Sequence, residues 1–142
     1  MFKNFILLFV MYFMLMSLSA QSVIGKWKTI DDETGEEKSI VEIYEVEGKI
    51  YGKILKVINA KRKNPLCDKC EGKNKDKPII GMVIIDGLKK DDDVYEGGNI
   101  LNPTNGKVYK CRLKIEDDKD TLQVRGYIAF FYKTQYWKRV SE

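Results

Sequence analysis

The chain has 142 residues, of which 44% are hydrophobic and 32% are charged, and its formal net charge is +4. This length suits one domain with a single core, and so mild a positive charge argues against a nucleic-acid partner. The chain contains no histidine, which excludes every catalytic triad or acid–base site that depends on that residue.

The first 20 residues have the pattern of a secretory signal peptide. A basic start at Lys3 precedes an almost unbroken apolar run over residues 5–16, which is shorter than the roughly 20 residues needed to cross a bilayer as a helix. We expect cleavage after Ala20. Because the next residue is not a cysteine, the lipid attachment of bacterial lipoproteins has no acceptor. The sequence therefore predicts one domain over residues 21–142 that is periplasmic or secreted, with a retained membrane anchor as the alternative.

Beyond this segment, apolar and polar residues alternate with a period of two between recurring turn signals. This pattern predicts antiparallel strands rather than helices. The first three strands are expected over residues 23–30, 39–46 and 49–58, and Glu47-Gly48 is typical of a tight hairpin between the second and the third. Imperfect alternation in the second strand predicts a β-bulge or burial on both of its faces.

Residues 59–78 are rich in lysine and contain two prolines and two cysteines. Such a composition cannot build a packed core, so we interpret this segment as an insertion loop. It carries no aromatic residue on which a nucleic-acid base could stack. The apolar run over residues 79–85 predicts a buried strand, with a loop or a short helix as the alternative.

The last third of the chain has the most regular alternation. Residues 102–106, Asn-Pro-Thr-Asn-Gly, are a turn cluster, and the strand that follows is expected to direct Tyr109, Cys111 and Leu113 into the core. Asp91-Asp92-Asp93 marks another turn before this cluster, two further strands follow, and the total is about eight. Eight antiparallel strands in so short a chain predict an all-β, up-and-down β-barrel, because closure removes exposed sheet edges. An open sandwich is the alternative.

Two short motifs at opposite ends of the domain resemble those of calycin-type barrels, the group that includes lipocalins. Gly25-Lys26-Trp27 begins the first strand, and Trp137-Lys138-Arg139 ends the last one. In lipocalins, an arginine of the last strand packs on the tryptophan of a G-x-W motif and plugs one end of the barrel. The resemblance implies this structural role for Gly25, Trp27 and Arg139, with the guanidinium stacked over the indole.

The domain as a whole is similar to the exported bacterial family called domain of unknown function 2147. Departures occur at residues 94–96, where a tryptophan is expected before the glycine pair, and at Asn102, where aspartate is usual. The resemblance implies a small exported barrel and no particular chemistry. The motifs that carry it are Gly25-Lys26-Trp27-Lys28-Thr29, residues 48–54, Cys67-Asp68-Lys69-Cys70, residues 77–81, Gly97-Gly98-Asn99-Ile100-Leu101, residues 106–109, Arg125-Gly126-Tyr127 and residues 134–140.

Cys67 and Cys70 form the one motif that points to reactivity. Cys111 shares the apolar side of its strand with Leu113, so we expect a buried free thiol there and a disulfide between Cys67 and Cys70. The loop lacks the strand and helix of a thioredoxin-like site, and a zinc site would need further ligands in a chain without histidine. Metal binding and redox exchange stay open as alternatives, and no cofactor is predicted.

Aromatic side chains either line a ligand cavity or fill the barrel, and the short strands favour a filled interior. Our leading hypothesis is a lipocalin-like, non-enzymatic binding protein that takes a small apolar or amphipathic molecule at the open end of its barrel. The alternatives are an envelope protein-interaction module with a filled barrel, and a metal or redox protein using the cysteine loop. The candidate ligand-lining residues are Trp27, Tyr51, Tyr109, Tyr127 and Trp137.

Overall fold

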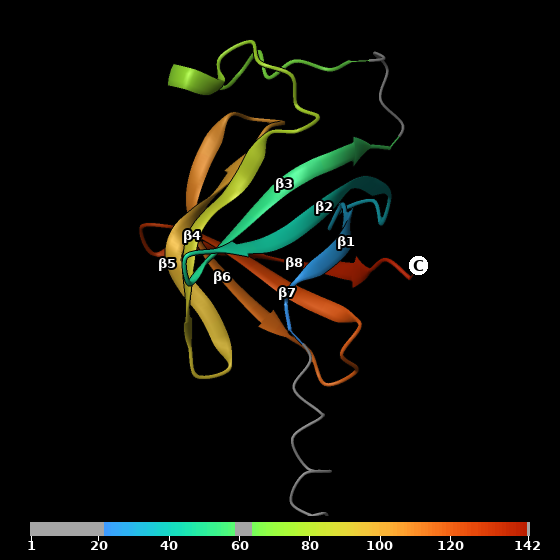
Figure 1. The fold of residues 1–142 in the computed structure, drawn as a ribbon. Helices are drawn as coiled ribbons and strands as arrows, with labels where there is room; N and C mark the ends of the chain where they lie inside the picture. The colour runs from blue at the N-terminus through green and yellow to red at the C-terminus, as the bar shows by residue number, and fades with distance from the viewer. Residues whose placement is uncertain (1–21, 59–63, 142) are drawn as a thin grey trace, which may run out of the picture.

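The computed structural model describes residues 22–58 and 64–141, which fold into one closed antiparallel barrel (Figure 1). Each strand pairs with the next along the chain, and β1 closes the barrel on β8. The predicted all-β, up-and-down barrel is confirmed, and the open sandwich is wrong. The eight strands of the described residues are β1 (Gly25–Ile30), β2 (Glu37–Val46), β3 (Lys49–Val57), β4 (Val83–Asp91), β5 (Val94–Asn102), β6 (Lys107–Ile115), β7 (Thr121–Ile128) and β8 (Phe131–Arg139).

The predicted signal peptide over residues 1–20 lies outside the described residues. Within residues 22–58 and 64–141, the structure contains no helix long and apolar enough to cross a membrane.

The connections between strands alternate between the two ends of the barrel, as the up-and-down order requires. At the end where β1 begins, which we call the closed end, lie the turns over residues 47–48, 92–93 and 116–120. The opposite end, which we call the open end, carries the β1–β2 turn, the β5–β6 turn, the β7–β8 turn and the long connection between β3 and β4. The ends of the barrel therefore differ in which loops cover them.

Side chains that point inward fill the closed half of the barrel. Trp27, Ile43 and Leu113 are completely buried, and Leu88 and Leu122 join them in the same apolar cluster. Their positions follow from the period of two, because alternate residues of one strand face the same side of the sheet. Packing in this half matches the filled interior that short strands favour.

The predicted turns form as expected. Glu47 and Gly48 both have positive φ, 51° and 79°, the conformation that a two-residue hairpin turn of this kind requires. In the β5–β6 turn, the Gly106 N–H donates to the Asn102 carbonyl at 2.8 Å. The predicted irregularity in the second strand also occurs, as a register shift between Ile40 and Val41 against β3.

The expected strand over residues 79–85 is wrong in its first half, because β4 begins only at Val83. Gly81 has a φ of 88°, which bends the chain before the strand. The Gly81 N–H donates to the Ile54 carbonyl at 2.6 Å, and the Ile54 N–H donates to the Met82 carbonyl at 3.0 Å. Backbone hydrogen bonds to the end of β3 therefore hold this segment in place of a regular strand.

The connection between β3 and β4 is better ordered than its composition predicts. Over residues 64–82 it contains a bridge between Leu66 and Pro78 and a 3-10 turn at Gly72–Asn74. Cys67 and Cys70 are buried and belong to the main apolar cluster, so this insertion loop adds two side chains to the core of the barrel. The two cysteine side chains are the buried apolar groups of a segment that is otherwise rich in lysine.

A candidate ligand site at the open end of the barrel

The closed end is sealed by a contact between β1 and β8. Trp27 and Arg139 are register partners, and the guanidinium carbon lies 4.2 Å from the centre of the indole ring. The same guanidinium donates to the carbonyls of Ser22 at 3.1 Å and Lys119 at 3.2 Å, while the Trp27 indole N–H donates to the Val23 carbonyl at 2.8 Å. This is the plug that the lipocalin resemblance implies for Trp27 and Arg139.

Gly25 is needed at this plug for a steric reason. Its φ is 137°, and a Cβ at this position would lie 3.3 Å from Nη1 of Arg139. A larger residue would therefore strain the backbone and crowd the guanidinium at once.

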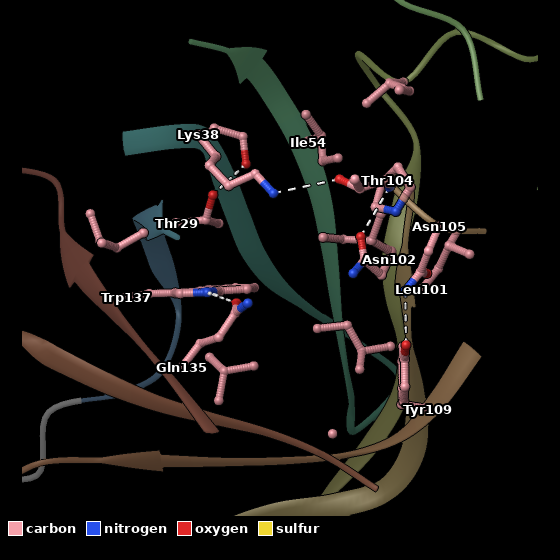
Figure 2. A pocket seen from close by; sticks show the side chains of 18 of the residues that line it. Thr29, Lys38, Ile54, Leu101, Asn102, Thr104, Asn105, Tyr109, Gln135 and Trp137 are labelled. Atoms are coloured by element: carbon pink, nitrogen blue, oxygen red, sulfur yellow. Dashed lines mark hydrogen bonds between the residues drawn. The ribbon is translucent and has the colours of Figure 1, made fainter. Parts of the chain in front are cut away.

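Above the plug, the barrel is hollow. A cavity of about 300 Å³ occupies the open half and reaches solvent between the loops of the open end (Figure 2). This volume is at the lower limit of the roughly 300–1,000 Å³ that small-molecule sites occupy. The interior is therefore filled at one end and empty at the other, so the predicted filled barrel is correct for the closed half only.

The cavity wall is largely apolar and includes polar side chains from several strands and loops. Figure 2 shows Trp137 and Gln135 on one side of the cavity and Tyr109 on the opposite side, with Thr104 and Asn105 near the entrance. The apolar wall consists of Ile30, Ile54, Val57, Ile79, Ile84, Ile100, Leu101, Val124 and Trp137. The polar lining residues are Thr29, Lys38, Ser39, Asn102, Thr104, Asn105, Tyr109, Lys133 and Gln135.

Several polar side chains of the wall are held by hydrogen bonds to one another. The hydroxyls of Thr29 and Ser39 lie 2.7 Å apart across β1 and β2. The Trp137 indole N–H donates to Oε1 of Gln135 at 3.2 Å, and Nδ2 of Asn105 donates to the Tyr109 hydroxyl at 2.9 Å. These pairs fix the direction of each side chain and provide both donors and acceptors to a bound molecule.

Two lysines lie at the mouth, and each has an acidic partner on the β1–β2 turn. Lys38 lies 3.8 Å from an oxygen of Asp31, and Lys133 lies 3.3 Å from an oxygen of Asp32. The hydrogen bond with Asp32 raises the pKa of Lys133, while backbone N–H groups of Thr34 and Glu33 lower the pKa of Asp31. The mouth therefore carries charges of both signs in close pairs.

The disulfide loop supports one side of the entrance. Cys67 and Cys70 are joined by a disulfide bond, which confirms the predicted pairing. Sγ of Cys67 lies 3.6 Å from the carbonyl oxygen of Pro103, a residue that lines the cavity. A Cβ on Gly106 would lie 1.8 Å from the carbonyl oxygen of Lys69, so only glycine allows the loop and the β5–β6 turn to approach this closely.

The remaining cysteine, Cys111, is buried and free, as expected from its alternation. Burial raises the pKa of its thiol to about 12, so the reactive thiolate is scarce at neutral pH. Among the described residues, no group of three or more Cys, Asp or Glu side chains is arranged to hold a metal ion.

The five candidate lining residues are distributed over three places. Tyr109 and Trp137 line the cavity, whereas Trp27 lies in the plug of the closed end. The expectation for Tyr51 and Tyr127 is wrong, because both alternate with inward residues and face outward. Tyr51 stacks on Tyr44 with 5.9 Å between ring centres, and Tyr127 packs against Tyr132 at 5.7 Å.

Sequence reasoning missed the polar and small residues of the cavity. Ser39, Thr29 and Gln135 lie on the inner sides of their strands, and Gly126 lets Tyr109 pack closely over its backbone, because a Cβ there would lie 3.2 Å from Cβ of Tyr109. Three of these residues, Ser39, Thr29 and Gly126, are small and lie at positions that the alternation directs inward. This combination is the sequence feature that indicates space inside the barrel.

Comparisons with known proteins agree with this architecture. Residues 25–139 match the model of a family described as uncharacterized proteins conserved in bacteria (DUF2147). Among solved structures, the chain is similar to HP1028 from the human pathogen Helicobacter pylori, which is described as belonging to the lipocalin family. The two are 23% identical with a TM-score of 0.75, covering 87% of this chain and 86% of HP1028.

At this level of identity, the likeness to HP1028 shows a shared barrel fold. No curated protein matches the chain. The family resemblance inferred from the sequence motifs is confirmed, because the match extends from the glycine of the first motif to the arginine of the last. The chain belongs to the DUF2147 family of uncharacterized bacterial proteins and has a lipocalin-like fold.

Proposed function

We propose that this chain is an exported carrier, rather than an enzyme, that binds a small amphipathic molecule in the open half of its barrel. The observation that carries the proposal is the cavity of about 300 Å³, with an apolar wall and a hydrogen-bonding mouth. An apolar wall favours the transfer of a hydrophobic group out of water, by roughly 25 cal/mol for each Å² buried. The likeness to a lipocalin-family protein is consistent with this use of the fold.

The position of the polar residues sets the orientation of the ligand. Trp137 and Val124, which are nearly fully buried, form part of the deep wall, whereas Thr104 and Asn105 are exposed at the entrance. A molecule with an apolar body and a polar end would place the body against Trp137 and the end at the entrance. The volume limits the ligand to a small ring system or a short chain.

The test is a fluorescence titration with N-phenyl-1-naphthylamine, a small neutral apolar probe. We expect saturable binding with a blue shift of emission for the wild-type protein. Val124→Phe places a larger side chain in the cavity and should weaken binding at least tenfold. Val46→Phe is the matched control, because Val46 lies near the closed end and is 47% exposed.

Equal probe affinity in the wild type and Val124→Phe would reject the cavity as the binding site. Absence of probe binding in the wild type would favour the alternative of an interaction module. Thermal unfolding of each variant, followed by circular dichroism, verifies that the barrel is intact.

A further inference from the structure

The β7–β8 turn presents large apolar side chains to solvent. Phe130 is 96% exposed, Phe131 is 77% exposed and Ile128 is 44% exposed. Only two residues connect the strands, and Ala129 has a φ of 50°, so the turn is tight and projects the aromatic rings outward. Contiguous apolar surface of this kind on a small protein marks a site of interaction.

The outer wall of the barrel behind this turn is mostly positive, although Asp93 lies 3.7 Å from Lys114 on it. The sequences of β6, β7 and β8 contain no Asp or Glu. Arg112 and Arg125 are directly opposite each other on β6 and β7, where like charges repel, and Arg125 donates to the Tyr127 hydroxyl at 3.5 Å. Among the described residues, neither arginine nor the nearby Lys110 takes part in an ion pair. The basic residues of the three strands are Lys107, Lys110, Arg112, Lys114, Arg125, Lys133, Lys138 and Arg139.

Tyrosines separate the apolar turn from the arginines. Tyr127 and Tyr132 are register partners next to the turn. Arg125 lies two residues before Tyr127 on β7, about 7 Å farther from the turn at the usual rise per residue. Its guanidinium carbon is 4.6 Å from the centre of the Tyr132 ring, and its Nε donates to the Thr134 hydroxyl at 3.0 Å. The order from the turn inward is therefore apolar, tyrosine, arginine. This is the order of acyl chains, interface and phosphates in a bilayer, where tyrosine prefers the interface.

We propose that the β7–β8 turn and the cationic wall behind it dock on the surface of an anionic phospholipid bilayer. Phe130 and Phe131 would enter the boundary between headgroups and acyl chains, while Arg112 and Arg125 contact lipid phosphates. Insertion of about 5–10 Å is typical of amphipathic elements that lie on a bilayer without crossing it. Charge complementarity selects this occupant, because each basic residue near an anionic lipid surface strengthens the attraction to it.

Docking in this orientation brings the mouth of the cavity to the lipid. Lys133 and Gln135, only two and four residues after Phe131 on β8, both line the cavity. The acidic β1–β2 turn also lies at the open end, where Asp32 is paired with Lys133. Repulsion of that turn by anionic lipid tilts the contact toward β6 and β7. The proposal does not depend on what the cavity binds.

The experiment is co-sedimentation of the processed protein, purified from the cell envelope and verified by mass to lack residues 1–20, with vesicles of phosphatidylcholine alone or with 30% phosphatidylglycerol. We expect wild-type protein to bind the anionic vesicles at least tenfold more tightly than the neutral ones, and less tightly as salt is added. Phe130→Ser/Phe131→Ser should lower this affinity at least tenfold. Arg112→Gln/Arg125→Gln should lower it by a similar factor, about fivefold for each arginine, and weaken the salt dependence.

The matched control is Lys89→Gln/Lys90→Gln, which removes the same charge from exposed positions on β4 and should change binding less than twofold. Equal binding of the wild type to both vesicle types, or unchanged binding of the arginine variant, would overturn the proposal. So would a dimer in sedimentation velocity that the Phe130→Ser/Phe131→Ser variant loses, because the occupant would then be a second copy of the chain. Probe binding by the serine variant should equal that of the wild type, which separates this test from that of the cavity.

Discussion

The two ends of this barrel are built from the same eight strands but differ in how their interiors are filled. At the closed end, Trp27 is completely buried and Arg139 ties it to the backbone carbonyls of two neighbouring segments. At the open end, the inward-pointing side chains do not meet across the barrel, and a cavity of about 300 Å³ remains. The difference indicates that one half of the barrel supplies most of the folding free energy and thereby permits the other half to stay hollow.

The largest expected effect comes from removing one tryptophan at each end. Trp27→Ala should lower the free energy of unfolding by about 3–5 kcal/mol, because it empties a packed region and leaves Arg139 without its ring partner. Trp137→Ala should lower the free energy of unfolding by at least about 1 kcal/mol less than Trp27→Ala does. One side of the Trp137 ring already faces the cavity, so this ring makes fewer contacts. Urea unfolding followed by far-ultraviolet circular dichroism measures both values.

An equal or larger loss for Trp137→Ala would contradict the division into a packed end and a hollow end. The comparison is well matched, because each indole N–H has one hydrogen-bond partner, the Val23 carbonyl for Trp27 and Gln135 for Trp137.

A smaller effect is expected from the disulfide at the rim of the open end. The bond between Cys67 and Cys70 closes a ring of only a few residues, so its reduction should lower the free energy of unfolding by no more than about 2 kcal/mol. Urea unfolding with and without dithiothreitol measures the change, and Cys111 is reduced in both conditions. A loss comparable to that of Trp27→Ala would contradict the small contribution expected for so short a ring.

The fold could largely be predicted from the sequence because its determinants are local or lie at the chain's recognisable motifs. Alternation locates β1, β2 and β3 to within a few residues and places β6 directly after the turn at residues 102–106, whereas β4 begins later than expected and β5 is given no bounds. Glu47-Gly48 specifies its hairpin through backbone conformation alone. Closure was predicted from Gly25-Lys26-Trp27 and Arg139, which meet as register partners in the structure. Tyr127 was assigned to the interior against the alternation of its own strand, an error that consistent use of the period would have avoided.

The candidate site was predicted less well, because a cavity depends on contacts between distant segments. Trp137 lines the cavity because the side chains of the opposite strands do not reach it. The local sequence around Trp137 does not specify those distant side chains. The contact of Gly106 with the Lys69 carbonyl likewise joins two loops that the sequence presents as independent. The sequence predicts the disulfide between Cys67 and Cys70, but the lysine-rich composition around it gives no sign that both cysteines are buried.

Native mass spectrometry of the protein purified from its own cell envelope tests the central claim most directly. We predict that the wild-type protein carries the added mass of a small molecule, that Val46→Phe carries the same mass, and that Val124→Phe has lost it. An unliganded mass for all three proteins, or an added mass that Val124→Phe retains, would contradict a binding function for the open half of the barrel.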